Sequence, residues 1–139
     1  FRATGERYGL GSAANNLGYT YLELGRYEEA AAALQESLDA HRLAGDRYGE
    51  AMTLDSLGAL HRRLGEHGTA MRYLVEALEL RREIGDRHGE GLTEGGIGDV
   101  LRDGGHLRRA RQRWRTALAI LDQLGAPQAD AIRDRLAGG

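Results

Sequence analysis

The stretch GDRYGE at residues 45–50 returns as GDRHGE at residues 85–90, and a related copy, GERYG, lies at residues 5–9. Corresponding residues of successive copies are 40 positions apart. A sequence repeat with a fixed period of roughly 20–50 residues is typical of a solenoid or another stacked array. The spacing therefore predicts units of 40 residues that share one local fold.

The similarity extends through each whole unit. Residues 5–44 and 45–84 share 13 identities, and residues 45–84 and 85–124 share 12. Identities spread over complete units, rather than confined to the turn, predict three repeats at about residues 5–44, 45–84 and 85–124. We expect these repeats to form a single domain across residues 1–139.

Apolar residues inside each unit follow a helical period of i, i+3 and i+4. In residues 48–63 the stripe is Leu54, Leu57, Gly58, His61 and Leu64, and in residues 67–84 it is Ala70, Tyr73, Leu74, Ala77, Leu78 and Ile84. Only one Pro occurs, and no run of β-branched residues alternates with polar ones. Each unit is therefore predicted to be two antiparallel helices, which makes the expected fold class an all-α solenoid of helix pairs.

Glycines mark the predicted ends of these helices. Gly45, Gly65 and Gly85 follow the apolar stripes and can adopt the left-handed conformation that ends a helix. Asp46 and Asp86 then fit as N-caps of the next helix. The repeated turn is thus predicted to be the joint between one helix pair and the next.

Three further glycines, Gly18, Gly58 and Gly98, fall inside predicted helices. A glycine in a helix interior costs about 1 kcal/mol relative to Ala. We expect the partner helix to approach closely at these positions, because close contact would offset that cost.

Together these positions resemble the tetratricopeptide repeat (TPR), whose pattern has a small residue after Leu, an aromatic residue three positions on, and a small–bulky–small series in the second helix. The three units carry it as Leu17, Gly18, Tyr21, Ala30, Leu34 and Ser37; Leu57, Gly58, His61, Ala70, Leu74 and Ala77; and Ile97, Gly98, Leu101, Ala110, Trp114 and Ala117. The resemblance implies a TPR superhelix of three repeats. Residues 127–137 predict a C-terminal capping helix, since Pro127 suits a first helical turn.

The unit is longer than the common TPR of about 34 residues, and the closing Pro is absent at Arg42, Arg82 and Asp122. This long form resembles the arrays of kinesin light chains, spindle-orientation adaptors and bacterial nucleotide-switch transcriptional regulators. All 19 basic residues are Arg, a composition typical of high-GC genomes, which favours the bacterial group. The resemblance implies a non-catalytic protein-interaction module or, alternatively, the regulatory or sensor region of a larger signal-transduction ATPase. A Walker loop upstream would favour the alternative.

Composition argues against several classes of protein. There is no Cys, which leaves no disulfide frame or thiolate metal site, and the five His form no HxxxH pair. No nucleophile or phosphate-loop motif is present, so we expect no enzyme activity, cofactor or metal. The net charge of −2 gives no general attraction to nucleic acid or membranes. No signal peptide or apolar run of about 18 residues is visible, so a cytoplasmic location is expected.

The resemblance also implies a ligand site on the concave surface lined by the first helices, where a protein or peptide segment would bind. The matching residues are Ser12, Asn15, Asn16, Tyr19, Leu22, Met52, Asp55, Ala59, Arg62, Arg63, Leu92, Gly95, Asp99 and Arg102. Asn15, Asn16 and Asp55 would bond a ligand backbone, and the arginines would pair with carboxylates. The alternative is a solvated concave face, with the ligand sites in other repeats of a longer array.

Three segments carry further expectations. Residues 1–9 align with residues 41–49, so we expect them to begin inside a preceding second helix, as a fragment of a longer array. Helix 9–23 would then expose an apolar face for self-association or for other domains of the parent chain. In HLRRARQRWR, residues 106–115, Arg108, Arg111 and Arg115 share one helix face, either solvated or in contact with an acidic partner or nucleic acid.

The first helix of the third unit, residues 88–103, is expected to be weak. It contains Gly91, Gly95, Gly96 and Gly98, and glycine disfavours a helix. Glu94 stands where the second unit has Leu54, so little compensating packing is expected. Gly95 is predicted to leave a shallow pocket beside Asp99 and Arg102.

Overall fold

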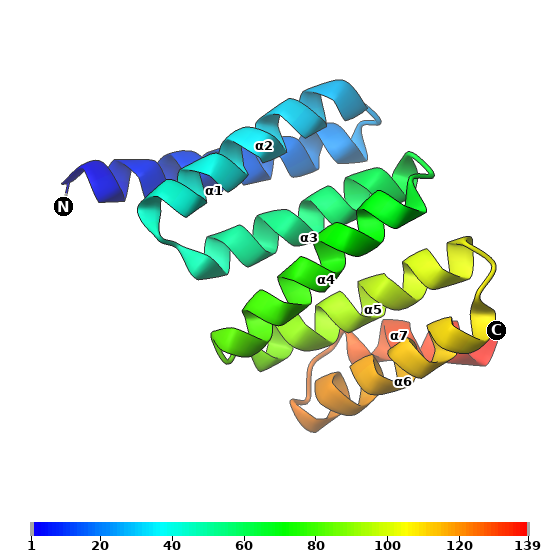
Figure 1. The fold of residues 1–139 in the computed structure, drawn as a ribbon. Helices are drawn as coiled ribbons and strands as arrows, with labels where there is room; N and C mark the ends of the chain where they lie inside the picture. Colours follow the sequence, from blue (N-terminus) through cyan, green and yellow to red (C-terminus); the bar gives the residue numbers. More distant parts are fainter. Residues whose placement is uncertain (1, 139) are drawn as a thin grey trace.

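Seven helices follow one another in the computed structural model, which describes the backbone of residues 2–138 and the side chains of residues 11–138. They are α1 (Arg2–Glu23), α2 (Tyr27–Ala44), α3 (Arg47–Arg63), α4 (His67–Glu83), α5 (Arg87–Asp103), α6 (Leu107–Gln123) and α7 (Ala129–Gly138). Antiparallel pairs stack in chain order, and the two termini lie at opposite ends of the array (Figure 1). The predicted solenoid of three helix pairs and a final short helix is confirmed.

Every loop turns at a glycine in the left-handed conformation, with φ between 66° at Gly125 and 87° at Gly105. The predicted turns at Gly45, Gly65 and Gly85 are among them. The carboxylates of Asp46 and Asp86 accept hydrogen bonds from the amides three residues on, each at 3.0 Å. The predicted helix ends and N-caps are therefore confirmed.

The second glycine of the repeated turn has a packing reason that the sequence did not reveal. A Cβ atom on Gly49 would overlap the imidazole of His41, and one on Gly89 would overlap the guanidinium of Arg81. Both of these side chains lie near the end of the preceding second helix. The GDRxGE motif therefore combines a turn, a helix cap and room for one side chain beneath the next helix.

The glycines inside the first helices lie against their partner helices, as predicted. A Cβ atom on Gly18 would lie 2.6 Å from Leu34 Cγ, and one on Gly98 would lie 2.5 Å from Trp114 Cδ1. At Gly58 the corresponding distance to Leu74 Cδ2 is 2.6 Å. A larger residue would force the two helices of each pair apart.

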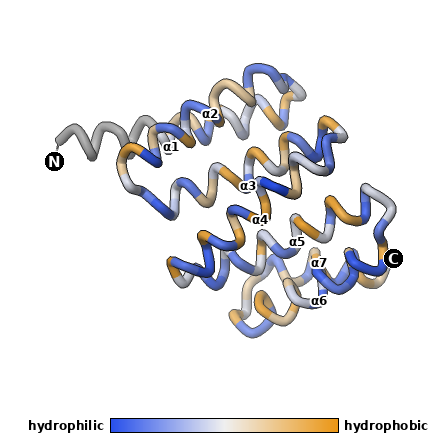
Figure 2. Tube along the Cα trace, viewed as in Figure 1, coloured by the Kyte–Doolittle hydropathy of each residue, from blue (hydrophilic) through white to orange (hydrophobic). Residues whose placement is uncertain are grey.

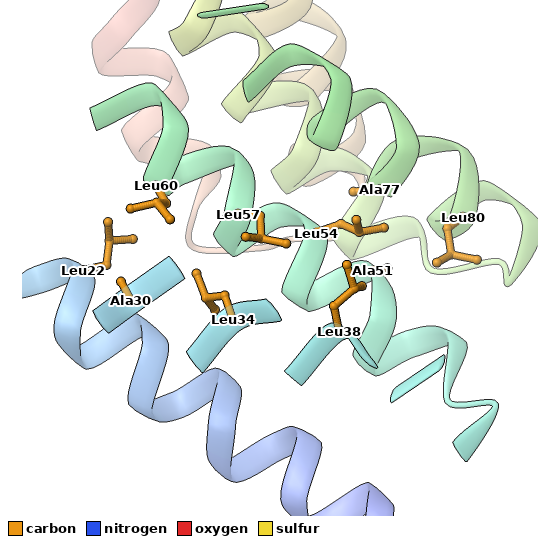
Figure 3. Packing of buried hydrophobic residues seen from close by; sticks show 10 residues of the cluster. All are labelled: Leu22, Ala30, Leu34, Leu38, Ala51, Leu54, Leu57, Leu60, Ala77 and Leu80. Atoms are coloured by element: carbon orange, nitrogen blue, oxygen red, sulfur yellow. The ribbon is translucent and has the colours of Figure 1, made fainter. Parts of the chain in front are cut away.

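The core forms clusters between the stacked helices, and its largest cluster joins the first two units. Leu34 and Leu38 of α2 pack there against Leu54 and Leu57 of α3 (Figure 3). Apolar and polar residues are mixed along the helices (Figure 2), because only one face of each helix is buried. Most predicted core positions are buried or half-buried, among them His61, which stacks on Tyr73.

Two predicted core residues are exposed instead. Leu64 and Ile84 are the C-cap residues of α3 and α4, and the chain turns away at the glycine that follows each of them. Their side chains therefore extend past the helix pair and into solvent. The prediction that they belong to the core stripes is wrong.

The predicted joint at residues 5–9 is also wrong, because α1 runs from Arg2 to Glu23 with no break at Gly5. Residues 2–4 instead extend α1, and Gly5 lies inside a continuous helix rather than at its end. The packing predicted for helix 9–23 is described only from Gly11 onward, since earlier side chains lie outside the described residues.

The last helix begins later than predicted. Pro127 lies in the turn before α7, and the carbonyl of Pro127 accepts a hydrogen bond from the amide of Asp130 at 3.2 Å. Ala129 and Ile132 then bury the apolar face of α7 against α6. None of the helices in the described part of the chain is long and apolar enough to cross a membrane.

Candidate ligand groove

A cavity of about 430 Å³ lies on the face formed by the first helices α1, α3 and α5, with part of α4 beneath them. Eight of the predicted groove residues line it: Asn15, Tyr19, Met52, Asp55, Ala59, Arg62, Leu92 and Asp99. The remaining lining residues are Ser56, Gly58, Leu74, Arg81, Thr93 and Gly96. The structure therefore brings residues of three successive first helices together around one hollow.

The other predicted residues lie outside this cavity. Leu22 is only 1% exposed and belongs to the core, so its assignment to the groove is wrong. Arg63 donates to the carbonyl of Leu22 and to Glu23 Oε1, both at 3.0 Å. Arg102 lies 5.6 Å from the centre of the Trp114 ring. Ser12 and Asn16 do not line the cavity.

The sequence missed the floor of the cavity, which comes from a second helix. Leu74 and Arg81 belong to α4, yet both reach the space between the first helices. Gly58 and Gly96 have no side chains to cover α4 and so leave this floor open. The sequence feature that could have predicted this floor is the pair Gly58 and Gly96, which lie on the cavity-facing side of α3 and α5.

Arg81 is the centre of a polar network at one end of the cavity, and it is only 5% exposed. Its Nε and Nη2 atoms donate to Asp55 Oδ2 at 2.9 Å and 2.5 Å, and Nη1 donates to Asp86. Thr93 Oγ1 donates to Asp55 Oδ1 at 2.8 Å. The network therefore ties α3, α4 and α5 together.

Burial raises the pKa of Asp55 above its ordinary value, and this effect outweighs the opposing influence of Arg81 and Thr93. Burial by itself would lower the pKa of Arg81, but the two carboxylates of Asp55 and Asp86 raise it. The arginine thus remains a cation between two acids.

The neighbouring joints differ from this one at two or at all three of these positions. Corresponding positions 40 residues away carry Asn15, His41 and Asp46 in the preceding joint, and Gly95, Leu121 and Ala126 in the following one. Where Leu121 replaces the arginine, both acids are also replaced by small apolar residues. Asp55 and Arg81 are therefore both replaced in each neighbouring joint, and Asp86 is replaced only in the following one.

Two further charged residues of the cavity are also paired. Asp99 Oδ1 accepts from Trp114 Nε1 at 3.1 Å and lies 2.8 Å from Arg135 Nε. Arg62 Nε donates to Asp103 Oδ2 at 2.6 Å. Although burial raises the pKa of Asp103, its contacts with Arg62 and Arg102 lower it below the ordinary value. Each charged group that lines the cavity therefore has an opposite charge beside it.

Asn15 is the exception among the buried polar groups of the cavity. The residue is 6% exposed, and its Oδ1 atom is buried with no hydrogen-bond partner. Unsatisfied buried acceptors are rare in folded proteins, because the lost hydrogen bonds to water are not replaced. Asn15 is therefore a cavity-lining residue with a buried polar atom that has no hydrogen-bond partner.

A second, smaller cavity of about 240 Å³ continues from the first toward α7 and shares Leu92, Gly96 and Asp99 with it. Gly95 lines this second cavity, and a Cβ atom there would lie 3.0 Å from Ile132 Cδ1. The predicted pocket beside Gly95 and Asp99 thus exists, but it is completed by Arg135 of α7 rather than by Arg102. The reason is that α7 packs over this end of α5.

Glu94 also differs from expectation. It is 2% exposed and lies between two arginines, with Oε1 2.8 Å from Arg113 Nη1 and Oε2 3.4 Å from Arg82 Nη2. The prediction that this position gains little from its surroundings is therefore wrong. On α6, by contrast, Arg108, Arg111 and Arg115 make no ion pair within the described part of the chain.

Comparison with known proteins settles the family. The family model of the tetratricopeptide repeat matches residues 9–83 and 51–123. The chain belongs to the tetratricopeptide repeat family. TPR domains are typically interaction modules rather than catalysts, and the fold of this chain is consistent with that role. The more specific resemblance to long-repeat adaptors or bacterial regulators stays a prediction.

Two solved structures are similar to this TPR domain. A Rap protein in complex with competence and sporulation factor has a TM-score of 0.86 at 16% identity, over 91% of this chain and 35% of the Rap chain. The TPR domain of Arabidopsis FLU has a TM-score of 0.77 at 22% identity, over 84% of this chain and 98% of that one. At these identities the likeness concerns the fold alone. No curated protein matches the sequence.

Proposed function

We propose that this TPR domain binds a peptide or protein segment in the groove formed by α1, α3 and α5, and that it catalyses no reaction. The observation that carries the proposal is the cavity of about 430 Å³ on that face. Its volume is within the range of roughly 300–1,000 Å³ that is common for ligand sites. The similar Rap protein was solved with competence and sporulation factor, which supports a ligand-binding role for an array of this shape.

The alternative assignment, to the regulatory or sensor region of a bacterial nucleotide-switch regulator, remains a prediction about the parent protein. A cytoplasmic location and contacts with other domains of the parent chain belong to the same prediction. A Walker-type phosphate loop in the same gene would support it. The groove proposal does not depend on that outcome.

The groove can be tested by filling it. Gly96 lines both cavities, and a Cβ atom there would meet only Leu74, at 3.7 Å. Gly96→Leu should therefore fold while blocking the hollow. Gly68→Leu is the matched control, since Gly68 is an exposed helical glycine outside both cavities and its Cβ position is open.

The probe is a peptide selected on the wild-type domain from a random display library. We expect Gly96→Leu to weaken binding of that peptide about tenfold or more, because a central contact is lost. Gly68→Leu should bind like the wild type in a fluorescence-polarisation titration. Equal binding to all three proteins would contradict the proposed site.

A further inference from the structure

We propose that this groove selects an uncharged, apolar anchor side chain carried on an amide backbone, and that it rejects acidic and basic anchors. The inference rests on the proposed function and specifies the ligand of the same site. It departs from the prediction that Arg62, Arg63 and Arg102 pair with ligand carboxylates. Its basis is how the charges of the cavity are already arranged.

The charged residues that line the cavity are paired with groups of this same chain. Arg81 holds Asp55 through two hydrogen bonds, Arg135 holds Asp99, and Asp103 holds Arg62. Of the other arginines predicted to bind carboxylates, Arg63 is engaged by Glu23 and Arg102 lies over Trp114. Among the residues whose side chains are described, 11–138, the groove therefore offers a ligand no cation or anion without a partner.

At the buried side of the cavity, where Arg81, Asp55 and Asp99 lie, a charged anchor would have to disrupt one of these pairs. A ligand carboxylate placed in the cavity would lie near Asp55 and Asp99 and would compete with them for their arginines. A ligand ammonium would have to displace Arg81 from Asp55. Either exchange leaves a buried charge without its partner, which is strongly unfavourable. A neutral anchor leaves every pair intact.

Apolar surface is what the cavity does provide. Met52, Ala59, Leu74 and Leu92 form much of its wall and floor. Leu92 is 38% exposed, so part of its side chain is available to a ligand. Covering these side chains with a ligand side chain would remove apolar area from water, which favours binding.

Asn15 supplies the polar part of the recognition. Its buried Oδ1 atom has no partner, and a side-chain amide offers both an acceptor and donors. A half-turn about the Cβ–Cγ bond of Asn15 exchanges the positions of its carbonyl oxygen and its NH2 group. A ligand amide carries the complementary donor and acceptor without any net charge. The amide next to the anchor is therefore the group we expect Asn15 to bind.

The test uses the library-selected peptides. Each peptide position is replaced by Ala in turn, and binding is measured to the wild-type domain and to Gly96→Leu. The anchor is the position where the replacement weakens binding to the wild type most and changes binding to Gly96→Leu little. That position is then synthesised with norleucine, Glu or Lys, which have similar lengths and differ in charge. We expect Glu and Lys to bind at least about tenfold more weakly than norleucine, because each charge displaces an existing pair.

A second arm tests the amide. Asn15→Ala and Asn15→Leu should each weaken the norleucine peptide, whereas Asn16→Ala, at the exposed neighbour outside the cavity, should not. Asn15→Leu keeps a γ-branched side chain at this position without its polar atoms, so it separates a lost hydrogen bond from a lost wall. Thermal melts confirm that each variant is folded. Full binding by both folded Asn15 variants would overturn this part of the inference.

The outcomes separate the two proposals. Peptides that bind in a Gly96-dependent way through a neutral anchor support both. Peptides that depend on Gly96 but prefer an acidic or basic anchor leave the proposed function standing and overturn this inference. Peptides that bind Gly96→Leu as well as the wild type overturn the proposed groove, and this inference with it.

Discussion

Gly58 and Gly96 both lie inside first helices and both face Leu74, yet their surroundings differ. A Cβ atom at position 58 would lie 2.6 Å from Leu74 Cδ2, whereas at position 96 the distance to the same atom is 3.7 Å. The first distance is too short for two carbon atoms, and the second is an ordinary contact. The same substitution should therefore have opposite effects at the two positions.

We expect Gly58→Ala to destabilise the domain, because the clash with Leu74 outweighs the gain in helix propensity. Gly96→Ala should stabilise it by up to about 1 kcal/mol, since only the propensity term acts there. Urea unfolding followed by circular dichroism measures both. Two variants that shift the midpoint in the same direction would show that packing does not distinguish these glycines.

Arg81 allows a second test at the scale of the residue. Arg81→Leu leaves Asp55 and Asp86 without their cation, and removing one partner of a buried pair typically costs about 3–5 kcal/mol. Adding Asp55→Ala and Asp86→Ala imitates the following joint, which carries Gly95, Leu121 and Ala126. We expect the triple variant to recover part of the lost stability. The recovery is incomplete because Asp86→Ala also removes the N-cap of α5. A triple variant no more stable than Arg81→Leu would contradict this coupling.

The loss in Arg81→Leu should also depend on pH. Burial already raises the pKa of Asp55, and removing the arginine takes away an effect that lowers it. A carboxyl with a raised pKa in the folded state opposes folding once it is ionised, so its penalty is full above that pKa and is lost as the pH falls from it toward the ordinary pKa. Unfolding curves at a series of pH values should show the gap to wild type narrowing toward acid. A gap that widens would refute the assignment.

At the scale of the helix, α5 combines five glycines with close packing against α6 and α7. Cβ atoms at Gly91, Gly95 and Gly98 would lie 2.9, 3.0 and 2.5 Å from Leu121, Ile132 and Trp114. These contacts hold α5 only while α6 and α7 remain in place. When α6 and α7 separate from α5, the low helix propensity of α5 favours its unfolding.

We therefore expect α5 to open locally before α3 does. Helix α5 has three more glycines than α3, which costs it roughly 1–3 kcal/mol in helix propensity. The free energy of local opening should be lower by a similar amount. Hydrogen exchange by mass spectrometry should show faster exchange across residues 88–103 than across residues 48–63, and Gly96→Ala should slow it. Equal protection of the two segments would exclude a weak α5.

The sequence predicted those features of the helices that depend on local pattern. Left-handed glycines, the Asp46 and Asp86 caps and the close approach at Gly58 follow from residues next to one another in the chain or one helix apart. The partners of Glu94 did not follow, because Arg82 and Arg113 reach it from two different helices. The exposure of Leu64 was missed because the apolar spacing of α3 continues through this residue in the sequence, whereas the helix itself ends before it.

At the scale of the whole molecule, equivalent residues have unequal surroundings. Leu57 and Ile97 are 2% and 1% exposed, because each packs against the second helix of the unit before it. Leu17 holds the same position in α1 and is 49% exposed. One position of the repeat therefore changes from core to surface with its place in the array.

Aspartate substitutions make that difference measurable. Leu57→Asp should abolish cooperative folding, because a buried carboxylate without a partner costs several kcal/mol and domains are stable by only about 5–15 kcal/mol. Leu17→Asp should melt close to wild type and should reduce self-association in light scattering at high concentration. A strictly monomeric wild type would contradict the association, and a normal melt for Leu57→Asp would contradict the register of the repeat.

Arg62 and Arg63 are consecutive residues of α3 that reach in opposite directions, to Asp103 at the end of α5 and to Glu23 at the end of α1. These contacts are partly exposed, so salt screens them with a Debye length of about 10 Å at 0.1 M. The buried Arg81 network is screened much less. Raising the ionic strength should therefore make the superhelix easier to bend at the rim that holds Arg62 and Arg63, while the joint at Arg81 stays rigid. The width of the groove available to a ligand would then vary with salt, although every helix remains folded.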